Sequence, residues 1–248
     1  MANINPKVVL ILQARMGSTR LPGKSMMDLA GAPLVGRMLE RVKRCNKIHQ
    51  IILAVPDTLE NLQLQRLGES YGVTVSAGSE NDLVDRYFNA AKGVAADVVV
   101  RLPADNATPQ WDQIDRIIDH HISLGRPGFS SNICDFWDSG FPDGIGAEVF
   151  DFCLLQDVAN KKLSSYNREH VHTNFFNYEL GEPVDSDWCP VSTVQCPESF
   201  RRPDLILDIN TQEQYLFLKS LYESLYPRNP NFGISDIVDW YDNEYQRD

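Results

Sequence analysis

The stretch 8-VVLILQARMGSTRLPGKS-25 joins an apolar run to a glycine-containing loop with three cationic side chains. The run at residues 8–14 is short and β-branched at its start, which predicts a buried strand. The loop ends in Gly-Lys-Ser, like the phosphate-binding P-loop G-x-x-x-x-G-K-S/T. However, five residues separate Gly17 from Gly23, and the next helical pattern begins only at residue 34. Because a P-loop has four residues there and a helix directly after its lysine, this loop must hold any phosphate differently.

Apolar runs and amphipathic segments alternate along the chain outward from this stretch. The expected strands are residues 8–14, 51–55, 73–77, 98–102 and 204–209. The expected helices are residues 34–45, a helix that ends at Gly72, and residues 81–93, 111–124 and 211–226. This alternation with short connections predicts an α/β fold with a mostly parallel central sheet and helices on both faces. We expect one domain over residues 1–248, in which the irregular segment 129–200 is an elaboration that serves as a substrate lid and a subunit contact.

The composition argues against several classes of function. The net charge is −11, which disfavours nucleic acid and anionic membranes as partners, because both require a positive field. Five cysteines without a C-x-x-C pair argue against a disulfide framework or a structural zinc site. No run is long enough to span a bilayer and no signal-peptide pattern is present, so we expect a cytoplasmic protein with no membrane partner.

The cations of the first loop form the first candidate site. Arg15, Arg20 and Lys24 follow the first strand at its carboxyl end, which is where open parallel sheets bind ligands. Guanidinium and ammonium groups can hold a triphosphate and neutralise the charge that develops on it. Gly17 and Gly23 would let the backbone approach closely. The alternative interpretation is a surface loop with solvated basic residues.

Two aspartates form the second candidate site. Asp105 follows the strand at residues 98–102, and Asp208 lies near the end of the run at residues 204–209. Carboxylates at strand ends suit Mg²⁺, which takes one or two of them together with phosphate oxygens and water. An Asx turn or a helix cap is the other interpretation of each aspartate. If the two strands are neighbours, both carboxylates would face one metal ion.

A third group of polar residues lies in the irregular segment. His170 and His172 would share one face if they lay on a strand, but a third zinc ligand is not evident. A phosphate or sugar contact by Arg168 and His170 is the better interpretation. No Ser-His-Asp or Cys-His arrangement can be inferred from the spacing.

Residues 13-QARMGSTRLPGKSMMDLAGAPLVGRMLERV-42 resemble the opening of the cytidylyltransferases that make CMP-activated acidic sugars. The resemblance is strongest to the branch named after spore coat polysaccharide biosynthesis protein F, which is related to acylneuraminate and 3-deoxy-manno-octulosonate cytidylyltransferases. Its signature, Arg-x-x-Ser-Thr-Arg-Leu-Pro-Gly-Lys, is highly specific. The likeness continues in the family's order through residues 79–92, 101–109, 142–150, 168–171 and 207–214.

The resemblance implies a Rossmann-like nucleotide-diphospho-sugar transferase fold and a homodimer. The implied reaction transfers CMP from CTP to an acidic sugar of the nonulosonic type and releases pyrophosphate, with Mg²⁺ as the cofactor. Such a reaction belongs to the biosynthesis of surface polysaccharides. Two alternatives stay open: a transferase with a different base or a sugar-phosphate acceptor, and a non-catalytic nucleotide-binding member of a glycan pathway.

The resemblance also implies roles for individual positions. The implied catalytic residues are Arg15, Lys24 and Asp105. The implied nucleotide-binding residues are Gln13, Ala14, Arg15, Gly17, Ser18, Arg20, Lys24, Ser79, Asp82 and Arg86. The implied acceptor-binding residues are Glu148, Arg168, Glu169 and His170. The implied metal ligands are Asp105 and Asp208.

Three positions depart from the family pattern. Asn106 and Ala107 replace residues that usually follow the metal-binding aspartate, which would reshape that loop. Gly146 stands in 142-PDGIGAE-148 where the family usually carries a carboxylate. We therefore expect acceptor recognition to change at Gly146.

Overall fold

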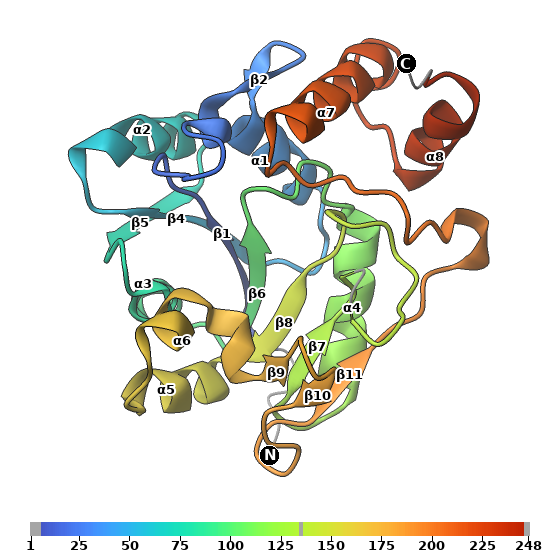
Figure 1. Ribbon diagram of the computed structural model, residues 1–248. Helices are drawn as coiled ribbons and strands as arrows, with labels where there is room; N and C mark the ends of the chain where they lie inside the picture. Colours follow the sequence, from blue (N-terminus) through green and yellow to red (C-terminus); the bar gives the residue numbers. More distant parts are fainter. Residues whose placement is uncertain (1–5, 134–135, 246–248) are drawn as a thin grey trace.

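The computed structural model describes residues 6–133 and 136–245, and a seven-stranded sheet lies at its centre (Figure 1). The strand order is β11-β7-β8-β6-β1-β4-β5. The strands are β1 (Val8–Gln13), β4 (Gln50–Pro56), β5 (Thr74–Gly78), β6 (Val98–Pro103), β7 (Phe129–Ser131), β8 (Glu148–Asp151) and β11 (Val191–Thr193). Two short hairpins lie outside this sheet, formed by β2 (Asp28–Leu29) with β3 (Ala32–Pro33) and by β9 (Phe176–Asn177) with β10 (Glu182–Pro183).

The sheet is mostly parallel, as predicted. β1 pairs in parallel with both β4 and β6, and β5 extends the sheet in parallel beyond β4. Only β8 is antiparallel to its neighbours β6 and β7 in the seven-stranded sheet. Side chains of β1 are buried on both faces, which explains why its sequence is an almost continuous apolar run.

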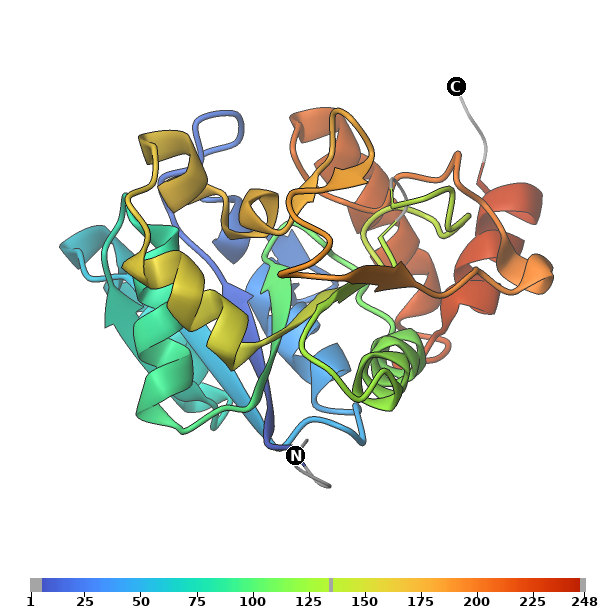
Figure 2. The same cartoon turned by 90° about the horizontal axis from the view of Figure 1, so that it is seen from below.

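Helices cover both faces of the sheet (Figure 2). On one face, Leu10 and Leu12 of β1 belong to a core shared with α1 (Leu34–Val42), α2 (Leu62–Ser70), α4 (Trp111–Ser123), α7 (Gln212–Leu225) and α8 (Ile234–Asn243). On the other face, Val9 and Ile11 belong to a core shared with α3 (Leu83–Gly93) and α5 (Phe152–Asn160). A short helix, α6 (Ser165–Glu169), packs against α3. The 3₁₀ helices are η1 (Lys24–Met26), η2 (Leu59–Asn61), η3 (Val171–Asn174) and η4 (Glu198–Phe200).

The predicted strand at residues 204–209 is wrong. The backbone there forms only two isolated bridges, between Asp208 and Asn106 and between Ile206 and Asp143. The apolar alternation has another cause, since Leu205 and Leu207 are buried in the core beside α7 while Ile206 is 48% exposed. The segment thus crosses the end of the sheet and does not join its edge.

The described part of residues 129–200 contributes to the same sheet and core. These residues supply β7, β8 and β11 to the sheet, and their aromatic side chains fill the core beneath α5 and η3. His170 and His172 do not lie on a strand, so the condition for a shared face is not met: His170 follows α6, and His172 lies in η3. We call residues 165–174, which comprise α6 and η3, the lid. The roles of this segment in acceptor binding and dimer contact stay predictions.

Two general features concern the described residues alone. None of the helices that the structure describes is both long and apolar enough to cross a bilayer. Four cysteines are free thiols, namely Cys45, Cys153, Cys189 and Cys196. Cys134 lies outside the described residues.

Candidate active site

A cavity of about 280 Å³ opens at the carboxyl ends of β1 and β6, where ligands bind in open parallel sheets. Its walls come from the loop after β1, the start of α3, the loop after β6 and the lid. Ten residues with predicted roles line it: Gln13, Ala14, Arg15, Ser18, Arg20, Lys24, Arg86, Asp105, Glu169 and His170. Residues far apart in the sequence are thus brought to one site.

Backbone hydrogen bonds hold the loop after β1 in shape. The N–H groups of Ser18 and Gly23 both donate to the carbonyl oxygen of Met16, over 2.9 and 3.0 Å. Gly23 has φ of 73°, in the left-handed region that favours glycine. The hydroxyl of Ser25 donates to the carbonyl oxygen of Arg15 over 3.0 Å. The loop is therefore a defined support for its cationic side chains.

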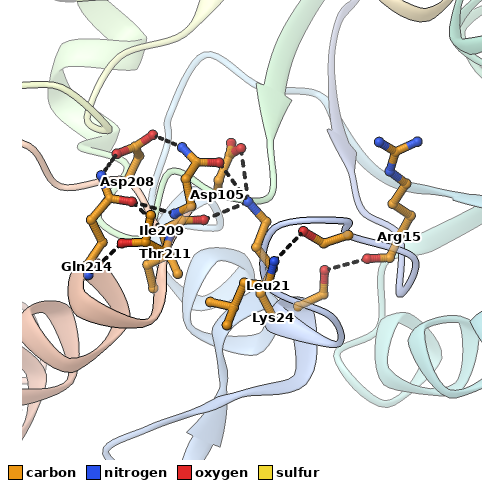
Figure 3. A network of polar contacts seen from close by, with 11 residues as sticks. Arg15, Leu21, Lys24, Asp105, Asp208, Ile209, Thr211 and Gln214 are labelled. Atoms are coloured by element: carbon orange, nitrogen blue, oxygen red, sulfur yellow. Dashed lines mark hydrogen bonds and ion pairs between the residues drawn. The ribbon is translucent and has the colours of Figure 1, made fainter.

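Lys24 joins three separate parts of the chain (Figure 3). Its Nζ donates to the carbonyl oxygen of Ile209 over 2.6 Å and to the side chains of Asp105 and Asn210, each over 3.2 Å. The Lys24 side chain is only 12% exposed. This ammonium group is therefore oriented by its neighbours before any ligand binds.

Asp105 and Asp208 lie on adjacent backbone segments. The sequence alone did not establish that these two segments are neighbours. Asp208 bridges to Asn106, and the N–H of Ile209 donates to the carbonyl oxygen of Asp105 over 2.9 Å. Burial and the charges of Asp143 and Asp105 raise the pKa of Asp208 to about 6. Asp208 is not the cap of α7, because Thr211 provides that cap. Asp208 instead accepts a hydrogen bond from Gln214 over 3.3 Å.

The donor set around these aspartates fits Mg²⁺. Burial and the nearby carboxylates of Asp143 and Asp105 both raise the pKa of Asp208, and a divalent cation would offset the part that is due to repulsion. Within the described residues, no three His, Cys, Asp or Glu side chains are grouped closely enough to hold a metal ion alone. A cation held by Asp105 and Asp208 would thus need phosphate oxygens or water as further ligands, which is the usual preference of Mg²⁺.

Two ion pairs tie the lid to the rest of the site. Arg15 contacts Glu169 over 3.3 Å, and Arg168 contacts Asp82 over 3.5 Å. Arg168 also donates to the backbone carbonyl oxygens of Ala159 and Lys161 at the end of α5. Arg168 therefore joins α5, α6 and α3, and it is not among the residues that line the cavity.

The remaining predicted nucleotide-binding residues shape the start of α3. Asp82 caps the helix by accepting from the N–H of Asp85 over 2.9 Å, and the hydroxyl of Ser79 accepts from the N–H of Asp82 over 3.0 Å. Arg86 donates to the carbonyl oxygen of Ser79 over 2.9 Å. Burial and the nearby Arg15 lower the pKa of Arg86 to about 10. Gly17 lies opposite this region, since a Cβ there would be 3.7 Å from Oε1 of Glu80.

Arg101 lines the cavity, although the sequence did not predict a role for it. Its guanidinium pairs with Glu148, the residue opposite it on β8. The hydroxyl of Tyr178 donates to the other carboxylate oxygen of Glu148 over 2.6 Å. Burial alone would raise the pKa of Glu148, but Arg101 reverses this effect and keeps the carboxyl ionised. The only sequence signal for Arg101 is a single charge inside the apolar run at residues 98–102.

The departure at Gly146 has a packing explanation. A Cβ at this position would lie 2.4 Å from the carbonyl oxygen of Asn132 and 2.7 Å from its Oδ1. The Asn132 side chain is fixed there, because it donates to the carbonyl oxygen of Gln113 and accepts from the N–H of Ala147. Gly146 therefore faces Asn132, and it is not among the residues that line the cavity.

His172 is expected to make the stability of the protein pH-dependent. Burial and Arg101 lower its pKa to about 4, although Glu148 acts in the opposite direction. Because the unfolded chain binds this proton near pH 6.5, the stabilising contribution is complete above that pH and is lost as the pH falls toward 4. Between pH 7 and 5, the free energy of unfolding should fall by about 1–2 kcal/mol more in the wild-type protein than in His172→Asn. Urea titrations at both pH values would measure this, and equal losses would contradict it.

Comparison with known proteins identifies the family. The model of the cytidylyltransferase family matches residues 9–225. The chain belongs to the cytidylyltransferase family. It is therefore a nucleotidyltransferase, as the resemblance implied.

Three similar proteins show how far the likeness extends. This cytidylyltransferase is 29% identical to spore coat polysaccharide biosynthesis protein SpsF of Bacillus subtilis over 93% of the chain and 92% of the relative. It is 36% identical to 3-deoxy-manno-octulosonate cytidylyltransferase of Chloroherpeton thalassium, over 45% of each chain. The solved structure of a cytidylyltransferase from Leptospira borgpetersenii has a TM-score of 0.85 and 27% identity, covering 98% of this chain and all of that one. The expected fold is thereby confirmed.

Proposed function

We propose that this cytidylyltransferase transfers CMP from CTP to an acidic sugar of the nonulosonic type, releases pyrophosphate, and serves surface polysaccharide synthesis. One observation carries the proposal: the cations of the loop after β1 and the carboxylate of Asp105 line the same cavity. The names of two relatives support the pathway and the acidic acceptor, since one acts in spore coat polysaccharide biosynthesis and another on 3-deoxy-manno-octulosonate.

The proposed reaction asks the protein mainly to position groups and to neutralise charge. A hydroxyl of the acceptor attacks the α-phosphorus in line, and pyrophosphate leaves. Arg15, Arg20 and Lys24 would hold the triphosphate from the loop after β1. The side chains of Arg15 and Glu169 are 42% and 48% exposed, so phosphate oxygens can replace Glu169 at little energetic cost. No side-chain nucleophile is required.

Magnesium is the proposed cofactor, and Asp105 and Asp208 would hold it. When bound, the ion would neutralise charge on the phosphates and stabilise the leaving pyrophosphate. Lys24 would contribute a fixed positive charge beside Asp105. The homodimer stays a prediction from the resemblance, and the cytoplasmic location stays a prediction from the sequence.

Pyrophosphate release tests the proposed function. We expect release only with CTP among CTP, UTP, GTP and dTTP, and only when Mg²⁺ and an acidic sugar such as 3-deoxy-manno-octulosonate or an acylneuraminate are present. Removal of Mg²⁺ with EDTA should stop it, because the triphosphate charge would then lack its main counter-charge. Release with another nucleotide, or with sugar phosphates alone, would contradict the proposed specificity and favour the alternative transferases.

A further inference from the structure

We propose that Arg101 recognises the carboxylate of the acceptor, and that Glu148 and Tyr178 position its guanidinium. This inference rests on the proposed function and adds to it the residue that selects an acid. Arg101 touches the cavity, whereas Glu148 and Tyr178 act through Arg101. The inference also reassigns Glu148, which the resemblance placed in direct contact with the acceptor.

The position of Arg101 separates it from the cations of the first loop. It lies on β6, and its neighbour on β8 is Glu148. Its other charged or polar neighbours are Tyr87 of α3, Tyr178 beyond β9 and His172 of the lid. Lys24 instead contacts Asp105 and the segment before α7. Arg101 therefore adds a guanidinium to the cavity from β6, outside the loop after β1, and the ionised carboxylate of Glu148 offsets its charge.

The unused hydrogen-bond donors of Arg101 indicate what kind of group it can bind. A guanidinium carries five N–H donors, and Nη1 of Arg101 is used by Glu148. The Nε of Arg101 has no hydrogen-bond partner among the described residues. Both carboxylate oxygens of Glu148 are already engaged, one by Arg101 and one by Tyr178. The network thus has donor capacity to spare, which suits an anionic ligand.

The geometry favours a carboxylate as that anion. Arginine presents a planar fork that matches a carboxylate through paired hydrogen bonds, and its charge persists when it is buried. Arg101 is only 8% exposed, and its ion pair with Glu148 on the neighbouring strand fixes its orientation. His172 adds no competing charge, because burial lowers its pKa to about 4 and keeps the ring neutral. The Arg101 side chain is therefore oriented to bind one carboxylate group.

Arg101→Lys tests the recognition role, because lysine keeps the charge and loses the planar fork. In this variant, we expect the KM of the acceptor 3-deoxy-manno-octulosonate to rise by at least about tenfold over the wild-type value. The KM of CTP should stay within about twofold of the wild-type value. The wild-type enzyme should discriminate against the carboxamide of the same sugar, and Arg101→Lys should lose most of this discrimination. Arg44→Lys is the matched control and should change neither KM, because Arg44 follows the end of α1, is not among the residues that line the cavity, and donates to the carbonyl oxygen of Pro230.

Tyr178→Phe tests positioning with less risk to folding. It removes one hydroxyl that is bonded to Glu148, so the acceptor KM should rise by about two- to fivefold with kcat and the KM of CTP nearly unchanged. If Arg101→Lys fails to fold, Tyr178→Phe becomes the deciding test of the role of Arg101. An unchanged acceptor KM in Tyr178→Phe would then overturn the proposal.

The remaining outcomes separate this proposal from the proposed function. An equal rise in both KM values would place Arg101 at the triphosphate and overturn the recognition role. If the wild-type enzyme uses acidic sugars while Arg101→Lys keeps the acceptor KM and the discrimination, only the role of Arg101 fails. If the wild-type enzyme uses no acidic sugar, the proposed function and the role of Arg101 fail together.

Discussion

Asp105→Asn should lower kcat/KM for CMP transfer by about 10³-fold, with the fold intact. Asparagine has the shape of aspartate but no charge. The change would therefore weaken the proposed Mg²⁺ site and remove the anionic partner of Lys24, which lies 3.2 Å from Asp105. Pyrophosphate release at increasing Mg²⁺ concentration would measure the effect, and the half-saturating Mg²⁺ concentration should also rise.

An exposed aspartate on α4 provides the control for this result. Asp119→Asn removes a carboxylate that pairs with Lys47 on the surface, where ion pairs contribute little to stability. We expect its turnover and its Mg²⁺ dependence to match those of the wild-type enzyme. Turnover by Asp105→Asn at the wild-type rate would exclude a metal or charge role for Asp105.

The parallel sheet and the cationic loop could be predicted because their signals are local. A strand buried on both faces needs an apolar run, and residues 8–14 and 98–102 provide one each. The loop after β1 was recognisable because its glycines and cations occur within a few consecutive residues. A local pattern of this kind does not depend on which distant segment packs beside it.

The rest of the site depends on contacts between residues far apart in the chain. The approach of Asp105 and Asp208 depends on the bridge between Asn106 and Asp208, which no local pattern encodes. The strand predicted at residues 204–209 is wrong for a related reason, since Leu205 and Leu207 alternate for core packing and the segment forms only isolated bridges.

Arg101 illustrates the same limit for a charged residue. In the sequence it is one charge within a strand, and its meaning appears only when β8 places Glu148 opposite it. A buried arginine without that partner would be unfavourable, so the pair must be found together. The spacing between the two residues contains no motif that would reveal this.

Gly144→Ala should destabilise the protein by about 2–4 kcal/mol and also reduce turnover at temperatures where the variant remains folded. Gly144 has φ of +83°, which costs an L-residue about 1 kcal/mol or more. A Cβ there would also lie 2.6 Å from the carbonyl carbon of Leu207 and 2.9 Å from the backbone nitrogen of Asp208. Because these are backbone atoms, no rotation of a side chain can relieve the clash.

The added Cβ would push against the backbone at Leu207 and Asp208. The same segment carries the carbonyl oxygen of Ile209, which accepts a hydrogen bond from Lys24. A shift of a few tenths of an ångström there would disturb the proposed metal site, so activity should fall together with stability. Gly125→Ala is the matched control, since Gly125 also has a positive φ of 65° but a Cβ there would meet nothing within 4 Å. Gly125→Ala should lower the free energy of unfolding by only about 1 kcal/mol, the cost of a positive φ in an L-residue, and should keep full activity. Urea unfolding and pyrophosphate release on both variants would separate the two effects, and equal losses in the two variants would show that Gly144 does not position Asp208.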